Sequence, residues 1–392
     1  MNFDKLRRLA ERNEVSLFDH GGRKRMPPYY YHSLRHALGF YFNTFNTQNS
    51  SYDTYAMGLS GRNVSILKSQ LLDEENTVLA IIAFERFFEL FLKDLLRKTD
   101  RRLTYSHRLN GNNKTLDLIN KVRNGSFNPN KYENKYLLAP FRESIDRFYG
   151  LIALHKAKHN DPIVKKFNQV LKTYSFLDSE DHKASMLLLS WYRDRILHNG
   201  NKIPSLWYLD YMITQRLIPM VKKITDVEKS KLGDSLFYFQ TESKINVLEK
   251  LSEVKYDFKE LNDKNKIRKM FMYLMYIGHL KELGRANLNM NLFVRENIQA
   301  TYEYNYKDPK GRAKRFAEAE RSHENFKEIR SCPCCTEKTL VVYRITIDDI
   351  FNRGKKRDID WVKCYLCDYH LRYNAGDPAL FDLHSEILFD EA

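Results

Sequence analysis

Apolar side chains recur at helical spacing along most of the chain, and this pattern predicts a mainly helical protein. The longest such stretch spans residues 74–96, where Ile81, Phe84, Phe88 and Leu92 fall on one face. Further large apolar residues widen that face, so we expect a long buried helix. Similar but shorter patterns predict helices at residues 141–158, 207–221 and 270–278, and an amphipathic stripe over residues 245–254.

A second prominent helix is predicted to end near residue 199. Apolar residues recur at helical spacing from Leu189 to Ile196. Asn199-Gly200, with a proline shortly beyond, is typical of a helix stop. The last two turns of this helix therefore carry charged and titratable side chains on a mostly apolar scaffold.

Arg193, Asp194 and His198 are the chemically informative residues of these two turns. Arginine carries a permanent planar charge that suits phosphate, and histidine exchanges a proton near neutral pH. Asp194 lies four positions before His198, so the two share a face and Asp194 could orient the imidazole. Arg193 is about 140° from His198 around a straight helix. These two side chains can converge only through the length of the arginine or across a second copy of the helix.

The segment Arg193-Asp-Arg-Ile-Leu-His198 resembles the Arg-polar-x-x-x-His signature of the HEPN superfamily of helical ribonucleases. Glu89-Leu-Phe-Leu-Lys93, within the long apolar helix, is similar to the Glu-x-x-x-Lys pattern of an early core helix in that family. The resemblance covers residues 73–221, with a long insertion, and leaves more than half of the chain outside it.

This resemblance implies a helical bundle that pairs as a homodimer, with both motifs lining one cleft. It implies an endoribonuclease that cleaves RNA through the 2′-hydroxyl and needs no cofactor for catalysis. Arg193 would hold the phosphate, His198 would act as base or acid, and Asp194 and Glu89 would be their polar neighbours. The family context further implies a toxin or antiphage defence effector, with a phage or antitoxin protein as an additional partner.

Each of these motifs also has a simpler interpretation. Cationic side chains such as Arg193 and His198 interact favourably with the dipole at the C-terminus of any helix. Glu89 and Lys93 are four residues apart, a spacing that stabilises a helix without any further function. A second Arg-x4-His match, Arg102 to His107, has leucine instead of a polar residue after the arginine, and no apolar helix precedes it. The alternative function is therefore a non-catalytic nucleic-acid-binding or protein-sensing adaptor, whose HEPN-like bundle serves only for dimerisation.

Charge and composition favour a polyanionic partner. The 392 residues carry a formal net charge of +15, and nucleic acid is the commonest polyanion in a cell. The 25 Tyr and 24 Phe residues are mostly expected in the core, but some could stack on unpaired bases. The charged first residues carry no secretory apolar region, and no apolar run is long enough for a membrane span. We therefore expect no membrane partner. The five cysteines are confined to the last 61 residues and indicate no disulfide framework, so we expect a protein of the reducing cytoplasm.

The cysteines form two Cys-x-x-Cys pairs near the C-terminus. Cys332 with Cys335, and Cys364 with Cys367, match the four-sulfur set of a structural Zn²⁺ site. Such a set leaves no open coordination position, which indicates a structural rather than a catalytic ion. Cys334 is the odd thiol; it could replace Cys335, although the spacing favours Cys335.

Residues 340–347 predict a strand between the two cysteine pairs, and the whole segment resembles a zinc ribbon. The predicted fold class is thus mainly α: a HEPN-like bundle with insertions, followed by a small zinc-ribbon-like α/β module. Basic runs at residues 23–25 and 307–315 are interpreted as solvated surface, with RNA contact as the alternative. The predicted divisions are an N-terminal arm (1–60), a HEPN-like helical domain with insertion (61–230), a helical region (231–329) and the zinc-ribbon-like module (330–392).

Overall fold

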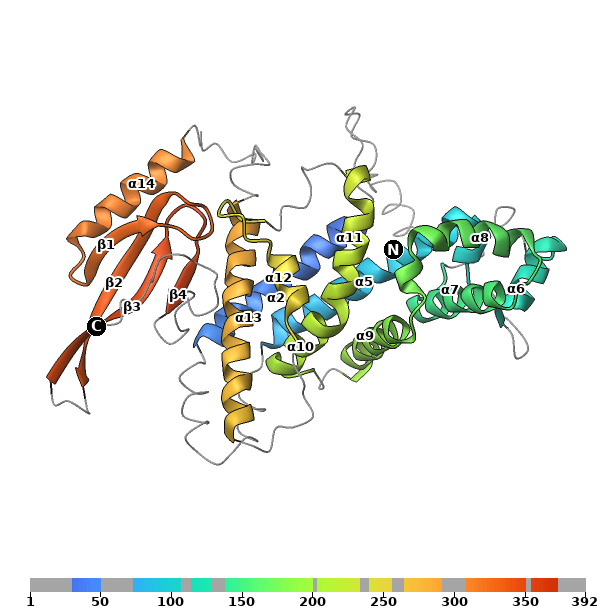
Figure 1. The fold of residues 1–392 in the computed structure, drawn as a ribbon, viewed down its shortest axis with the longest axis horizontal. Helices are drawn as coiled ribbons and strands as arrows, with labels where there is room; N and C mark the ends of the chain where they lie inside the picture. Colours follow the sequence, from blue (N-terminus) through green and yellow to red (C-terminus); the bar gives the residue numbers. More distant parts are fainter. Residues whose placement is uncertain are drawn as a thin grey trace, which may run out of the picture.

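A computed structural model describes the arrangement of most of the chain. It describes residues 30–50, 73–106, 114–127, 138–199, 203–232, 240–255, 264–290, 308–349 and 354–372. Helices make up most of the structure, and a small antiparallel sheet lies at one end (Figure 1). The prediction of a mainly helical protein with a small C-terminal module that contains strands is confirmed at this level. Among the described helices, none is both long enough and apolar enough to cross a membrane.

Helix α5 (Glu74–Thr99) is the central element of the helical part. Its first turn is closed by Asp73, whose side chain accepts a hydrogen bond from the Asn76 backbone N–H at 3.0 Å. Acidic residues in the first turn and basic residues in the last turn complement the helix dipole. The helix packs against α2, α7, α8 and α9. The prediction of a long buried helix over residues 74–96 is confirmed.

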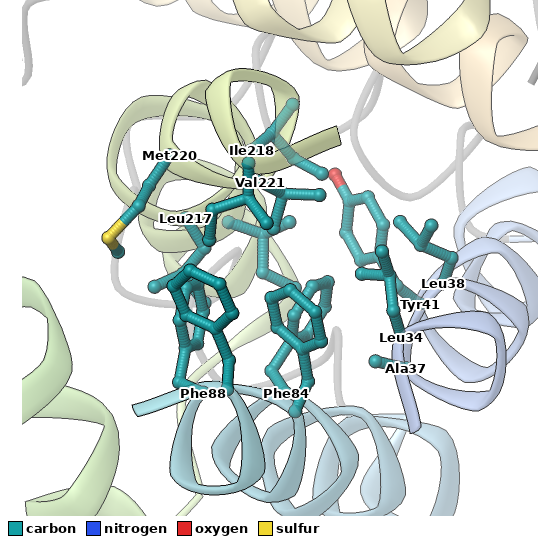
Figure 2. Packing of buried hydrophobic residues seen from close by; sticks show 14 of the residues in the cluster. Leu34, Ala37, Leu38, Tyr41, Phe84, Phe88, Leu217, Ile218, Met220 and Val221 are labelled. Atoms are coloured by element: carbon teal, nitrogen blue, oxygen red, sulfur yellow. The ribbon is translucent and has the colours of Figure 1, made fainter. Parts of the chain in front are cut away.

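Helix α2 (Tyr30–Ser50) makes the most extensive packing contact with α5. Figure 2 shows Leu34 and Tyr41 of α2 facing Phe84 and Phe88 of α5, with apolar residues of α11 and the turn before it closing the cluster. All four named side chains are fully buried. The described part of the predicted N-terminal arm is therefore a core helix, while the basic run at residues 23–25 lies outside the described residues.

Most of the remaining helices add to this core, whereas α14 packs against the sheet. The predicted helices at residues 141–158 and 207–221 are confirmed, the latter as a continuous helical segment with a π-helical turn at Ile213–Leu217. The predicted segment at residues 270–278 lies inside one much longer helix. Their bounds are α6 (Lys114–Arg123), α7 (Phe141–Lys156), α8 (Pro162–Thr173), α9 (Glu180–Asn199), α10 (Leu206–Met212), α11 (Ile218–Leu232), α12 (Val247–Glu253), α13 (Lys264–Met290) and α14 (Pro309–Ala319).

The sheet is an antiparallel meander with the strand order β1-β2-β3-β4. Its strands are β1 (Phe326–Ser331), β2 (Lys338–Asp349), β3 (Gly354–Cys364) and β4 (His370–Arg372). The strand predicted at residues 340–347 is confirmed as part of β2. Helix α14 packs against β2 and buries Ala317 there. Most of the basic run at residues 307–315 lies in this helix.

Helix α13 stands between the sheet and the other helices (Figure 1). Toward the helices, it contributes Lys281, whose Nζ lies 2.5 Å from Asp210 Oδ1 of α10. Both side chains are fully buried, and burial raises the pKa of Asp210 and lowers that of Lys281. Lys281 Nζ also lies 4.8 Å from the centroid of the Tyr41 ring on α2. Lys281 thus joins α13 to α10 through a buried ion pair and to α2 through a cation–π contact.

The tight contact between Gly284 of α13 and Phe42 of α2 predicts how substitutions there affect stability. A Cβ atom at Gly284 would lie 2.5 Å from the buried Phe42 ring, whereas a Cβ at Gly39 would have no neighbour within 4 Å. We expect Gly284→Ala to destabilise the protein by about 1–3 kcal/mol through overpacking. The matched change Gly39→Ala should stabilise it by up to about 1 kcal/mol, because alanine is the better helix former. Urea unfolding measures both; equal effects of the two changes would contradict this packing.

Candidate functional site

The four predicted cysteine ligands lie together at one end of the sheet. Cys332 and Cys335 lie on the turn between β1 and β2. Cys364 is the last residue of β3, and Cys367 lies on the turn between β3 and β4. Their sulfur atoms all lie within 4.8 Å of one another, and all four side chains are buried. The Sγ–Sγ distances are 3.5 Å for Cys332–Cys367 and 3.6 Å for Cys335–Cys364. These distances are too long for disulfides and close to the edge of about 3.8 Å in a tetrahedral ZnS₄ site.

The two cysteine turns have the same backbone geometry. In the first, the Thr336 N–H donates to the Cys332 carbonyl at 2.9 Å; in the second, the Asp368 N–H donates to the Cys364 carbonyl at 3.1 Å. Thr336 and Asp368 both adopt a left-handed φ of 61°. In each turn a backbone N–H also points at the first cysteine sulfur at 3.4 Å, which favours a thiolate there. This arrangement could hold a metal ion such as zinc.

Cys334 is not part of this sulfur cluster. Its Sγ lies 3.8 Å from the Leu283 carbonyl oxygen of α13 and is fully buried. The structure therefore groups Cys335, and not Cys334, with the other three cysteines. Of the two readings that the sequence left open, the spacing argument for Cys335 is the one that the geometry supports.

An ionic cluster, buried at Glu282 and Arg285 and exposed at Asp368, connects the second cysteine turn to α13. Arg285 makes two contacts of 2.8 Å with the Glu282 carboxylate and one of 2.9 Å with Asp368 Oδ2. The Glu282 carboxylate also accepts a hydrogen bond from the His370 backbone N–H. Burial raises the pKa of Glu282 to about 7, while Arg285 opposes that rise. The position of the cysteine cluster is therefore coupled to the helical part of the molecule.

The other predicted site lies at the end of α9, where that helix packs against α5. Arg193 is half-exposed, and its Nη1 donates to Asp194 Oδ1 at 2.9 Å. Its Nε lies 4.0 Å from Glu85 Oε1 on α5. His198 is exposed, and within the described part of the chain no hydrogen bond or ion pair engages its ring. The carboxylate of Asp194 is thus directed at Arg193, rather than at the imidazole that it was expected to orient.

Glu89, the predicted acidic neighbour of the motif, has different close partners. It forms an ion pair with Lys93, and its Oε2 lies 3.4 Å from Arg86 Nη1. Glu85, one turn earlier on the same helix, is the carboxylate that faces Arg193. Sequence reasoning missed Glu85 as a site residue, although its spacing of four from Glu89 places it on the same helix face. Glu89 still contributes to raising the pKa of Arg193, after the larger contributions of Asp194 and Glu85.

Glu85 is the most strongly perturbed group of this site. Its side chain is only 8% exposed. Burial raises the pKa of Glu85 to about 7; Glu89 adds to the rise and Arg193 opposes it. A hydrogen bond to Asp194 raises the pKa of Arg193, which therefore stays charged. The arrangement places an acid that titrates near neutral pH directly behind a permanent cation.

Comparisons with known proteins add no family to this description. No protein-family model, curated protein or solved structure matches the chain. The similarity to HEPN ribonucleases therefore rests on the motif residues themselves, and the roles assigned to Arg193, His198, Asp194 and Glu89 stay predictions.

The raised pKa of Glu85 predicts a specific pH dependence of stability. Its pKa rises from an ordinary 4.5 to about 7, so between these values the folded state keeps a proton that the unfolded state has lost. Stability should therefore fall as the pH rises through this window, by at most about 3 kcal/mol. Glu85→Gln cannot titrate and should not show this loss. The stability of the variant relative to the parent protein should therefore increase as the pH rises from 5 to 8.

Urea unfolding of both proteins across that range measures this difference. Other titrating groups, including Glu282, are present in both proteins and cancel in the comparison. Glu75→Gln is the matched control, because Glu75 is an exposed carboxylate on the same helix. Parallel stability curves for the parent protein and Glu85→Gln would mean that Glu85 is not held in a protonated state.

Proposed function

We propose that this chain is a metal-independent endoribonuclease of the HEPN type, which cleaves RNA through the 2′-hydroxyl. The observation that carries the proposal is the end of α9. There an exposed imidazole and a half-exposed guanidinium lie within two turns of one helix, and the guanidinium contacts a buried acid. These groups are accessible to a polymer from solvent, as an RNA-cleaving site requires.

The chemistry assigns a role to each group. His198 would take the proton from the 2′-hydroxyl or deliver one to the departing 5′-oxygen. Arg193 would bind the phosphodiester and stabilise the negative charge that grows on it as the new bond forms. The products would be a 2′,3′-cyclic phosphate and a 5′-hydroxyl. Asp194 and Glu85 would position Arg193 until the RNA arrives.

A homodimer is part of this proposal. Arg193 and His198 lie about 140° apart around the helix, so one copy presents them on different faces. A second copy of α9 would bring the arginine of one chain to the histidine of the other. The net charge of +15 supports an RNA partner. By family resemblance, we further propose a cytoplasmic toxin or antiphage effector that is controlled by a phage or antitoxin protein.

A structural zinc ion completes the proposal. Cys332, Cys335, Cys364 and Cys367 have the ligand type, spacing and burial of a closed zinc site. The ion would fix the two cysteine turns and hence the sheet. Through Arg285 and Asp368 it would also fix the sheet against α13. No catalytic step is assigned to it.

One observation favours the alternative of a non-catalytic adaptor. The Arg193 guanidinium already contacts two carboxylates, those of Asp194 and Glu85. If these contacts persist when nucleic acid binds, Arg193 serves only as the cation of a structural ion pair. The bundle would then dimerise and bind nucleic acid without cutting it. RNA affinity with steep salt dependence and no cleavage would support this reading.

Replacing the proposed proton-transfer group tests the ribonuclease directly. Purified protein should cut total cellular RNA and leave 2′,3′-cyclic phosphate ends. His198→Ala should lower the cleavage rate by about 10²–10⁴-fold, because it removes the general acid or base. Arg193→Ala should lower it by about 10²–10³-fold, because it removes phosphate stabilisation. Mapping of the cut ends measures both effects.

The matched control is His36→Ala, which removes an exposed histidine on α2. This variant should cleave at the parental rate, and thermal unfolding should show that all the variants are folded. Cleavage that survives both His198→Ala and Arg193→Ala would exclude this site.

Metal analysis tests the zinc proposal. The purified protein should contain about one zinc ion per chain. Cys364→Ser should lose the zinc and about 2 kcal/mol or more of stability, since metal binding contributes directly to folding. Cys334→Ser should keep the full zinc content, because its sulfur lies outside the cluster. In a short assay a chelator should leave RNA cleavage unchanged. Full zinc retention by Cys364→Ser would disprove the assignment.

A further inference from the structure

The outer face of α9 carries a stripe of side chains, of which the proposed reaction uses only His198. Trp191, Arg195 and His198 follow one another at helical spacings of four and three, so they lie along one face. Trp191 is 47% exposed, a high value for so large an apolar side chain. The stripe therefore runs from an open aromatic ring to the imidazole proposed to transfer the proton.

Neighbouring side chains hold the Trp191 ring in place. The Arg195 guanidinium carbon lies 4.4 Å from the centroid of the Trp191 ring, within the range of a cation–π contact. The Tyr192 ring meets the indole edge-on, with centroids 4.9 Å apart and planes at 77°. Tyr192 in turn lies 6.1 Å from the Tyr208 ring of α10. An exposed tryptophan supported in this way is an ordered platform.

Arg195 differs from Arg193 in the charges around it. Arg193 contacts Glu85 and Asp194, whereas no carboxylate within the described residues forms an ion pair with Arg195. Its guanidinium charge is therefore not neutralised locally. An aromatic platform beside an uncompensated cation matches the way proteins hold single-stranded nucleic acid, by stacking on bases and pairing with phosphates.

The geometry points to a subsite for one unpaired RNA nucleotide, in which Trp191 stacks on the base and Arg195 binds the adjoining phosphate. This inference rests on the proposed function and deepens it. Trp191 and His198 are separated by about 10 Å along the helix axis, so a base near the cleaved bond can reach the platform. A base held in a duplex cannot stack on a side chain in this way, so the enzyme would select single-stranded segments and loops.

Charge argues for RNA rather than a second protein copy at the Trp191–Arg195 end of this stripe, because the proposed dimer needs the second copy only at the His198 end. Two copies meeting symmetrically here would bring two Arg195 guanidinium groups together in a partly desolvated contact, which like-charge repulsion disfavours. A phosphate chain neutralises the same charge. The surface thus fits a polyanion with exposed bases better than it fits itself.

Binding to uncleavable RNA tests the subsite separately from catalysis. The probe is a fluorescein-labelled, 2′-O-methylated uridine oligonucleotide, single-stranded or annealed to its complement, with fluorescence anisotropy as the readout. Trp191→Ala should weaken single-strand binding about tenfold, and Trp191→Phe should retain most of the affinity. Arg195→Gln should lower the slope of log affinity against log salt by about 0.7. The duplex should bind Trp191→Ala as it binds the parent protein.

Two exposed residues elsewhere provide matched controls. Leu138→Ala removes an exposed apolar side chain, and Arg142→Gln removes an exposed arginine on α7. Both should bind the single strand as the parent protein does. Light scattering of each variant gives its oligomeric state.

The outcomes separate this inference from the proposed function. Parental single-strand affinity in Trp191→Ala and Arg195→Gln would overturn the subsite, even if His198→Ala abolishes cleavage. Loss of affinity in these variants without any cleavage by the parent protein would support the subsite and remove the ribonuclease. If Trp191→Ala instead converts a dimer into monomers, the stripe is an interface between copies and the subsite is wrong.

Discussion

The candidate site depends on one contact between two helices, that of Glu85 on α5 with Arg193 on α9. Glu85 is almost fully buried, and water therefore solvates its charged form poorly. The nearby guanidinium supplies part of the missing stabilisation, and α5 is long and apolar enough to hold the acid in place. Without the packing of α9 against α5, Arg193 would be an ordinary surface cation. The chemistry proposed for the end of α9 thus depends on the burial of the Glu85 carboxylate on the neighbouring helix α5.

A similar constraint joins the two ends of the molecule through α13. Lys281 and Glu282 are adjacent in sequence, yet they form buried ionic contacts on different sides of this helix. Lys281 pairs with Asp210 in the helical part, and Glu282 pairs with Arg285, which also contacts Asp368 beside the cysteine cluster. Buried charges are costly unless each one meets its partner, so the two contacts favour a single docking geometry for α13. A metal at the cysteines would rigidify the same junction.

The sequence predicted those features that depend on local pattern. Helix α5 follows from its run of apolar residues at helical spacing, and the cysteine cluster follows from two short pairs separated by a strand. Features that depend on non-local packing were missed. Whether Glu85 or Glu89 faces Arg193 depends on how α9 is rotated against α5. The spacing of residues within either helix does not specify this rotation. In the same way, β1 begins at Phe326, before the predicted boundary at residue 330, because it is defined by pairing with β2.

A phosphate that approaches Arg193 would also approach the carboxylate of Glu85, and two negative charges there would repel each other. Because the pKa of Glu85 is raised to about 7, protonation of its carboxylate can remove this repulsion. A second anion nearby raises the pKa of a buried acid further, so Glu85 would take up a proton as the phosphate arrives. The guanidinium could then exchange one anionic partner for another without leaving a buried charge unpaired. If RNA binds here as proposed, the acid behind Arg193 favours release of the cation to the phosphate, and binding would be accompanied by proton uptake.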